Sequence, residues 1–348
     1  MRPVANPPNP WASTSVEYLD DIPPATLQVF EEQARSIVSE NDSPDIGFRW
    51  SINPYRGCFH GCAYCYARPS HQWLGFGAGT DFERKLVVKT NAPELLRAHF
   101  ARRSWSGELV VFSGVTDCYQ PLEASYELTR RCLEVCLAYR NPVGVITKGA
   151  LVRRDRELLG RLARTATATV TLSIPFADEE LARRIEPFAG SPARRLDAMR
   201  ALAEAGVAVG VAVAPVIPGL NDRDIPRILT AAREAGATRA GMILVRLAGS
   251  VAPYFEQTLR ERLPGRAESV LARIRRARGG RLATPGFGER MRGTGPEWEA
   301  IEALFDVWTR KLGYDLPAGG GAEPAREEPP TAFRRPGGSR QIGLFGAG

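Results

Sequence analysis

The chain has 348 residues, of which 44% are hydrophobic and 24% charged, a composition typical of a folded globular protein. No apolar run approaches the roughly 20 residues that cross a bilayer, and the N-terminus lacks the apolar core of a secretory signal. We therefore expect a cytoplasmic protein that has no membrane partner. The formal net charge of +7 permits an anionic partner without identifying one, since arginine supplies nearly all of the cations.

The N-terminal part, residues 1–45, begins with a Pro-rich stretch, and we expect it to be partly disordered with one short helix over 25–40. From residue 46 on, short Val/Ile-rich runs alternate with segments that carry apolar residues at helical spacing. The runs lack polar alternation, as expected of parallel strands covered on both faces. The predicted strands lie at 48–53, 108–115, 143–148, 169–175, 207–217 and 240–247.

Helices are predicted between these strands, and three more follow the last strand. Several end at a glycine suited to a left-handed cap, such as Gly206 and Gly236. Six β-α pairs in series indicate an α/β protein, either a partial (β/α)6 TIM-like barrel or an open doubly wound sheet. We divide the chain into a core at 46–250, a helical region packed on it at 251–315, and a Gly/Pro/Arg-rich tail at 316–348 that we expect to be disordered.

The most specific motif is "GCFHGCAYC", in which Cys58, Cys62 and Cys65 have the spacing Cys-x3-Cys-x2-Cys. An odd number of thiols in a reducing compartment disfavours a set of disulfides. A structural zinc site would want a fourth ligand, and His60 and His71 lie nearby, although His60 is only two residues from Cys58. The third alternative is a [4Fe–4S] cluster that is held by three thiolates and leaves one iron open.

The cysteine spacing, with Tyr64 before the last cysteine and a strand before the first, resembles the radical SAM superfamily. Together with "FSGVTDCYQPLE", "VITK" and "APVIPGLND", it is similar to the subgroup related to spore photoproduct lyase, over about residues 46–313. The resemblance implies a barrel of the radical SAM type whose open iron is chelated by S-adenosylmethionine (SAM). It further implies that an electron donor such as flavodoxin or ferredoxin reduces the cluster. SAM is then cleaved to methionine and a 5′-deoxyadenosyl radical, which takes a hydrogen atom from a substrate carbon.

The same resemblance assigns roles to residues at the C-terminal ends of the strands. Ser113, Gly114, Thr116 and Asp117 follow the second strand, where the superfamily binds the SAM amino group. This loop lacks the usual Gly-Gly-Glu, and Glu123 is an alternative acceptor.

Two further strand ends carry candidate cofactor ligands. Lys148 ends the third strand and would match the SAM carboxylate, with an ordinary surface lysine as the alternative. Ser173 ends the fourth strand and could bond the same carboxylate or a ribose hydroxyl, or have a purely structural role. Arg195 follows among many arginines, most of which we expect to be solvated. Asn221 and Asp222 are expected to cap the next helix, with the alternative, implied by the resemblance, that their segment packs on the adenine of SAM.

The other three cysteines divide into two groups. Cys132 and Cys136 lie four apart on a predicted helix, in line with apolar residues, and are expected to pack against the sheet. Cys118 lies in the predicted active-site loop. In spore photoproduct lyase a thiol in this neighbourhood returns a hydrogen atom to the product radical, so Cys118 is a candidate for that catalytic role, with a buried loop cysteine as the alternative.

The last residues contain "RQIGLFG", where Gln341, Leu344 and Phe345 form a Gln-x-x-Leu-Phe pattern. This pattern is similar to the short peptides that dock on the bacterial DNA sliding clamp. Apolar anchors in a polar tail suit pocket binding by a disordered segment. The alternative is that the two apolar residues fold back onto the catalytic domain.

The function that we expect is therefore that of a radical SAM enzyme acting on damaged or modified nucleic acid. A second hypothesis is that the same core acts on a small molecule, a peptide or an RNA base. A third hypothesis is that the protein is not an enzyme but a zinc-stabilised nucleic-acid adaptor.

Overall fold

The computed structural model describes residues 26–283, 286–315 and 331–336. Its main sheet has seven strands, whose spatial order follows the chain from one edge to the other. From that edge they are β2 (Val38–Glu40), β3 (Trp50–Ile52), β6 (Val110–Phe112), β7 (Val143–Thr147), β8 (Ala168–Ser173), β9 (Ala208–Val216) and β10 (Arg239–Leu244).

Within this sheet the strands from β3 to β10 are all parallel, and β2 pairs antiparallel with β3. A doubly wound sheet would reverse its strand order at a switch point. The sequential order seen here therefore confirms the partial (β/α)6 barrel and excludes the doubly wound alternative. All six predicted strands of the barrel are present.

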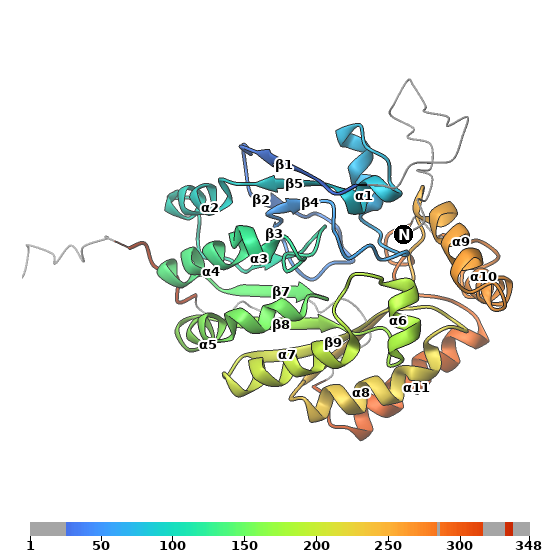
Figure 1. Cartoon of the computed structure of the whole chain (residues 1–348). Helices are drawn as coiled ribbons and strands as arrows, with labels where there is room; N and C mark the ends of the chain where they lie inside the picture. Colours follow the sequence, from blue (N-terminus) through green and yellow to red (C-terminus); the bar gives the residue numbers. More distant parts are fainter. Residues whose placement is uncertain (1–25, 284–285, 316–330, 337–348) are drawn as a thin grey trace, which may run out of the picture.

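The longer helices follow the outer face of the barrel (Figure 1). The longer ones are α2 (Ala92–Ala101), α4 (Leu128–Tyr139), α5 (Arg156–Thr165), α7 (Pro192–Glu204) and α8 (Ile225–Glu234), and the short ones are α1 (Thr80–Arg84), α3 (Glu123–Tyr126) and α6 (Glu179–Ile185). Gly206 and Gly236 have φ of +81° and +97°, which confirms the predicted left-handed ends of α7 and α8. Cys132 and Cys136 are fully buried in the core, so their predicted packing role is also confirmed.

A second sheet of three strands lies beside the barrel, in the order β1 (Gln28–Glu32), β5 (Lys85–Lys89) and β4 (Tyr55–Arg56). The helix predicted over 25–40 is therefore wrong, because β1 and β2 occupy its described part. The pairing of β1 with β5 joins segments far apart in the chain, and local periodicity does not reveal such a partner. Residues 1–25 lie outside the described part.

Three helices follow the last strand, as predicted: α9 (Val251–Arg262), α10 (Ala267–Arg276) and α11 (Pro296–Lys311). Figure 1 shows α9 and α10 side by side near the end toward which β7 and β8 point, while α11 lies along α8. No helix in the described residues is both long and apolar enough to span a membrane.

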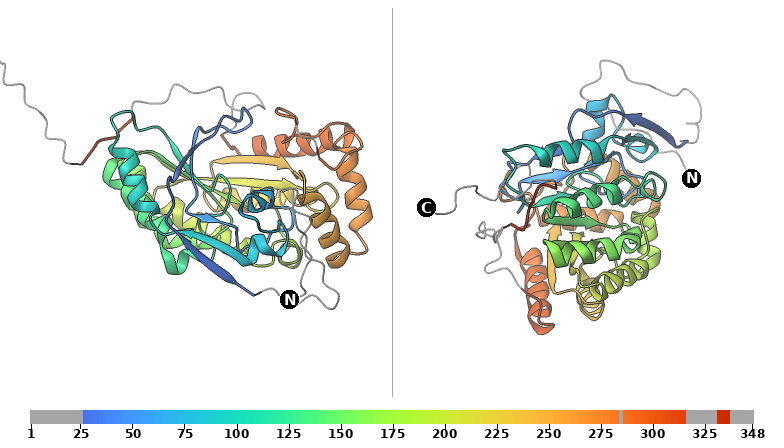
Figure 2. Two further views of the ribbon diagram at one scale, coloured as in Figure 1. Left: turned by 90° about the horizontal axis from the view of Figure 1, so that it is seen from above. Right: turned by 90° about the vertical axis from the view of Figure 1, so that its left-hand side faces the viewer.

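The segment 331–336 packs on the core, although the whole tail was predicted to be disordered (Figure 2). The ring of Phe333 lies 6.0 Å from that of Tyr139 and 6.2 Å from that of Phe100, measured between centroids. The backbone N–H of Arg334 donates to the carbonyl of Tyr139 at 2.8 Å. A Cβ at Gly107 would lie 2.2 Å from that of Phe333, so a glycine lets the segment approach. The rest of the tail, with Gln341, Leu344 and Phe345, lies outside the described residues.

Candidate active site

The cysteine loop follows β4, at the end of the barrel where the parallel strands finish. Two of its glycines, Gly57 and Gly61, have φ of +74° and +65°. A Cβ at Gly61 would lie 2.9 Å from the Glu83 carboxylate, so both the backbone and the space require glycine there. The loop is tied to its surroundings by backbone bonds: Cys58 N–H donates to Phe82 at 2.9 Å and Ala63 N–H to Ile185 at 3.0 Å.

Arg68 holds this loop from inside, and its side chain is fully buried. Its guanidinium donates twice to the carbonyl of Cys62, at 2.9 and 3.1 Å, and pairs with Glu83 at 2.9 Å. It also lies 3.9 Å from the ring centroid of Tyr254 on α9. The conformation of the cysteine loop therefore depends on a buried cation and on a helix that is remote in the chain.

The three thiols of the loop are free and lie close enough to influence one another electrostatically. Burial is the main cause that raises the pKa of Cys58, Cys62 and Cys65, and at Cys58 the two other thiols raise it further. Thiolates in this place therefore need a strong positive charge beside them, such as iron supplies.

No three His, Cys, Asp or Glu side chains in the described residues are grouped so that they could hold a single metal ion. The cysteine ligands of a [4Fe–4S] cluster lie farther apart than the ligands of a single ion, because each of them binds a different iron atom. Three free thiols spread over one loop are a donor set that fits a [4Fe–4S] cluster.

The loop after β6 turns sharply beside the cysteines. Ser113 has a φ of +77°, which is strained for a residue other than glycine. Its amide donates to Ile52 at 3.2 Å, and its hydroxyl accepts from the Cys118 amide at 2.8 Å, so both ends of the residue are fixed. A Cβ at Gly114 would lie 2.8 Å from that of Ser51. The hydroxyl of Thr116 is turned inward and donates to the carbonyl of Tyr55 at 2.7 Å.

Asp117 supplies the carboxylate of this loop. It accepts from the Thr147 hydroxyl at 2.6 Å and from the Lys148 amide at 2.7 Å, and His60 Nδ1 lies 3.4 Å away. Burial opposes the ionisation of Asp117, but the imidazole of His60 and these hydrogen bonds outweigh it and lower the pKa to about 2. Asp117 therefore ties the cysteine loop to the end of β7.

The side chains of Lys148 and Ser173 lie within hydrogen-bonding distance of each other, which the prediction that both bind the SAM carboxylate requires. Lys148 Nζ donates to the Ser173 hydroxyl at 2.5 Å and to the carbonyl of Ala214 at 3.1 Å, and it lies 5.5 Å from the ring centroid of Tyr64. The ammonium also lowers the pKa of Cys62 and Cys65, although burial dominates there, so it lies near the thiols. This arrangement places one cation and one hydroxyl beside the cysteine loop.

Glu186 completes this cluster, and no pattern in the sequence pointed to it. Its carboxylate pairs with Arg195 at 2.5 Å and with Lys148 at 3.4 Å, and it accepts from the Tyr64 hydroxyl. The side chains of Glu186 and Arg195 are both 1% exposed. Arg195 is thus an exception to the solvated arginines that the sequence predicts, because one buried carboxylate partners it.

Two other sequence candidates serve the fold. Glu123 is fully buried and accepts from the Tyr55 hydroxyl at 2.5 Å and the Thr129 amide at 2.8 Å, which commits it to the start of α4 and excludes it as an alternative cofactor acceptor. Asn221 accepts from the Ile217 amide and Asp222 from the Gly219 amide, each at 2.7 Å. Both therefore shape their own loop instead of capping α8.

Cys118 lies in the hydrophobic core and has no exposed surface. Burial raises the pKa of its thiol well above the ordinary value, and Asp117 raises it further. Its carbonyl accepts from the Thr129 hydroxyl at 2.6 Å. These contacts favour the buried-loop alternative, and hydrogen donation by Cys118 stays a prediction.

Comparison with known proteins places this chain in a family. A family model described as "Radical SAM superfamily" matches residues 52–232. An uncharacterized protein of Mycobacterium tuberculosis is 38% identical over 212 residues, which cover 60% of this chain and 62% of that protein. The match thus spans less than two thirds of that relative. The PqqA peptide cyclase of Granulibacter bethesdensis is 34% identical over 188 residues, 54% of this chain and 44% of the cyclase.

Among solved structures, spore photoproduct lyase complexed with dinucleoside spore photoproduct has a similar fold. The TM-score is 0.59 at 17% sequence identity, and the alignment covers 82% of this chain and 80% of the lyase. At this identity the likeness concerns the fold alone.

Proposed function

Because the chain belongs to the radical SAM superfamily, whose enzymes use a [4Fe–4S] cluster, SAM and an electron donor, we propose that Cys58, Cys62 and Cys65 hold the cluster. When bound, the reduced cluster and SAM supply a 5′-deoxyadenosyl radical that removes hydrogen from a substrate. The observation that carries this proposal is the group of three neighbouring free thiols beside the paired Lys148 and Ser173.

The chain's own residues have distinct tasks in this proposal. Lys148 offers its ammonium, and Ser173 its hydroxyl, to the carboxylate of SAM, since a charge-assisted hydrogen bond is strong where water is scarce. Tyr64 and Glu186 fix the position of that ammonium. The backbone from Ser113 to Asp117 lines the neighbouring strand end, on the side proposed for the amino group of SAM.

Anaerobic reconstitution tests the metal site. We expect about four irons and four sulfides per chain in the wild type, and loss of most of both in Cys58→Ser, Cys62→Ser and Cys65→Ser. Cys132→Ser, on α4, is the matched control and should keep the full complement. Equal iron content in the control and the three loop variants would remove the proposal.

The proposed substrate is nucleic acid. The fold of this chain resembles that of an enzyme solved with a dinucleoside photoproduct, and the net charge of +7 suits a polyanion. A peptide is the second candidate, which the 34% identity to the PqqA peptide cyclase favours.

Isotope transfer separates the two candidates. The reduced, cluster-loaded protein is incubated with SAM and either deuterated DNA, intact or damaged by ultraviolet light, or a deuterated peptide mixture. Deuterium in 5′-deoxyadenosine from DNA alone is the expected result. Transfer from the peptides alone would favour the second candidate, and transfer from neither would contradict both.

A further inference from the structure

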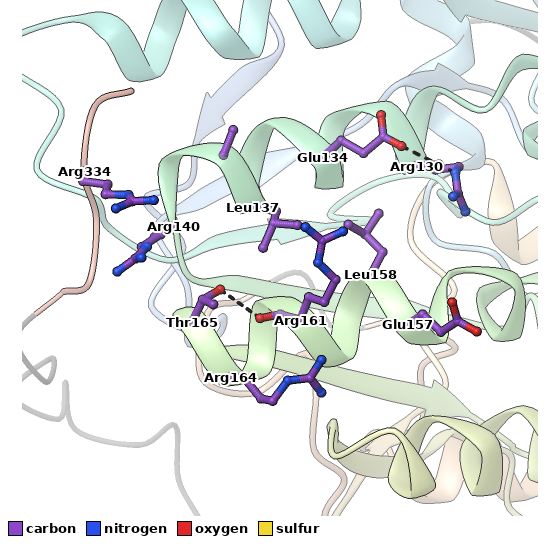
Figure 3. A pocket seen from close by; sticks show the side chains of 11 residues that line it. Arg130, Glu134, Leu137, Arg140, Glu157, Leu158, Arg161, Arg164, Thr165 and Arg334 are labelled. Carbon is purple, nitrogen blue, oxygen red and sulfur yellow. Dashed lines mark hydrogen bonds and ion pairs between the residues drawn. The ribbon is translucent and has the colours of Figure 1, made fainter. Parts of the chain in front are cut away.

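A groove runs between α4 and α5 on the outside of the barrel (Figure 3). Its volume is about 690 Å³, and Leu137, Ala138 and Leu158 contribute apolar side chains to its lining. The groove reaches Arg140 and Thr165, the residues at the ends of the two helices, just before β7 and β8 begin. It therefore extends to the end of the barrel opposite Lys148 and Ser173, and it is distinct from the candidate active site.

Four arginines around this groove lack an acidic partner among residues 26–283, 286–315 and 331–336 of the structure. Arg161 and Arg164 extend from α5, Arg140 follows α4, and Arg334 comes from the docked tail segment. The two acidic residues of the lining do not neutralise them, because each already faces another cation. Glu134 lies 3.6 Å from Arg130, and Glu157 lies 3.5 Å from Arg156.

We propose that this groove binds the phosphodiester backbone of a nucleic-acid strand. Guanidinium groups form bidentate hydrogen bonds with phosphate oxygens. Several arginines along one groove therefore match a nucleic-acid strand, which carries one negative phosphate for each nucleotide. The apolar lining gives the sugar and base faces a surface to contact. The proposal does not require that the bound strand be the substrate, and it holds whether or not the proposed reaction is right.

The docked segment 331–336 gives the groove its fourth arginine. Phe333 packs on Tyr139, and the neighbouring Arg334 thereby reaches the groove. Thr331 donates to the carbonyl of Gly107 at 3.0 Å, and Arg335 donates to that of Arg102 at 2.6 Å. This part of the tail is therefore a built component of the site, held by contacts on both sides of Arg334.

Binding is measured by fluorescence anisotropy with the cluster-loaded full chain and short labelled oligothymidylate or oligouridylate. If all four arginines contact phosphates, the slope of log affinity against log salt concentration is about −2.8 for a single strand. Arg161→Glu should weaken binding by about tenfold and make the slope shallower by about 0.7 or more. Arg227→Glu, an equal charge change at an exposed arginine of α8, is the matched control and should change affinity less than twofold.

Phe333→Ala provides an independent variant, because it leaves the net charge unchanged while releasing Arg334. We expect it to weaken binding several-fold, as Arg334→Ala does. Binding of either oligonucleotide supports phosphodiester recognition, and a preference for one of them tells which kind of strand is bound. No measurable binding of either would overturn the proposal. Equal losses in Arg161→Glu and Arg227→Glu would overturn the proposal. So would competition by polyglutamate as effective as that by unlabelled oligonucleotide, since the groove would then be a site for acidic polypeptides.

Discussion

Replacing Glu186 by glutamine is expected to destabilise the protein strongly, because it removes one partner of a buried ion pair. Glu186 and Arg195 are 2.5 Å apart, and each side chain is 1% exposed. Burial opposes the ionisation of Glu186, but Arg195 and Lys148 outweigh it and hold its pKa below the ordinary value. Glutamine would leave two cations without this carboxylate. Breaking such a pair costs about 3 to 5 kcal/mol, and since glutamine can still accept a hydrogen bond we expect about 3 kcal/mol.

The surface provides a matched control. Glu180 and Arg184 on α6 are also 2.5 Å apart, but their side chains are 72% and 46% exposed. An exposed pair of this kind contributes about 0.5 kcal/mol, so Glu180→Gln should be almost neutral. Anaerobic urea unfolding followed by tryptophan fluorescence should show a midpoint about 1 M lower for Glu186→Gln. A difference of less than about 1 kcal/mol between the two variants would refute the claim that burial sets the strength of this pair.

Three more outcomes follow from the described contacts. Asp117→Asn should lower the free energy of unfolding at neutral pH by about 2 kcal/mol, because the pKa of Asp117 falls from 3.8 to about 2 on folding. This stabilisation is fully present at pH values above 3.8 and is lost as the pH falls toward 2. Equal acid sensitivity of the variant and the wild type would contradict this. Phe333→Ala should speed tryptic cleavage after Arg334 by at least about tenfold while far-ultraviolet circular dichroism stays unchanged, since the released segment no longer packs on the core; an unchanged cleavage rate would show that the aromatic contacts do not hold it. Cys118→Ala should keep its iron, its rate of 5′-deoxyadenosine formation and its product, as a fully buried thiol that only packs requires; a changed product with intact iron and an unchanged rate of 5′-deoxyadenosine formation would support hydrogen donation by Cys118.

Local patterns predicted the six strands and the helices between them but left a barrel and a doubly wound sheet open, and the resemblance to the radical SAM superfamily implied the barrel. The run at 207–217 became β9, and the cysteine spacing marked the loop that follows the first barrel strand. The resemblance predicted Lys148 and Ser173 as ligands of the SAM carboxylate at two strand ends, and the structure brings them within hydrogen-bonding distance.

The features that could not be predicted from the sequence depend on contacts between residues that are remote in the chain. Glu186 and Arg195 each look like one more charged surface residue, and only their meeting inside the barrel permits burial. The strand β1 exists because it pairs with β5. The segment 331–336 has the composition of a disordered tail, and a single phenylalanine opposite Gly107 reverses that expectation.

The contact between Arg68 and Tyr254 affects how this chain could be shortened or recombined. Tyr254 lies on α9, beyond the stretch of 52–232 that defines the family, yet its ring covers the guanidinium that holds the cysteine loop. A fragment of residues 52–232 would keep every thiol but lose the Tyr254 ring that covers the Arg68 guanidinium. Water would then compete for the hydrogen bonds from Arg68 to the carbonyl of Cys62. A graft of the cysteine loop onto another barrel would accordingly have to bring an aromatic cover along with it.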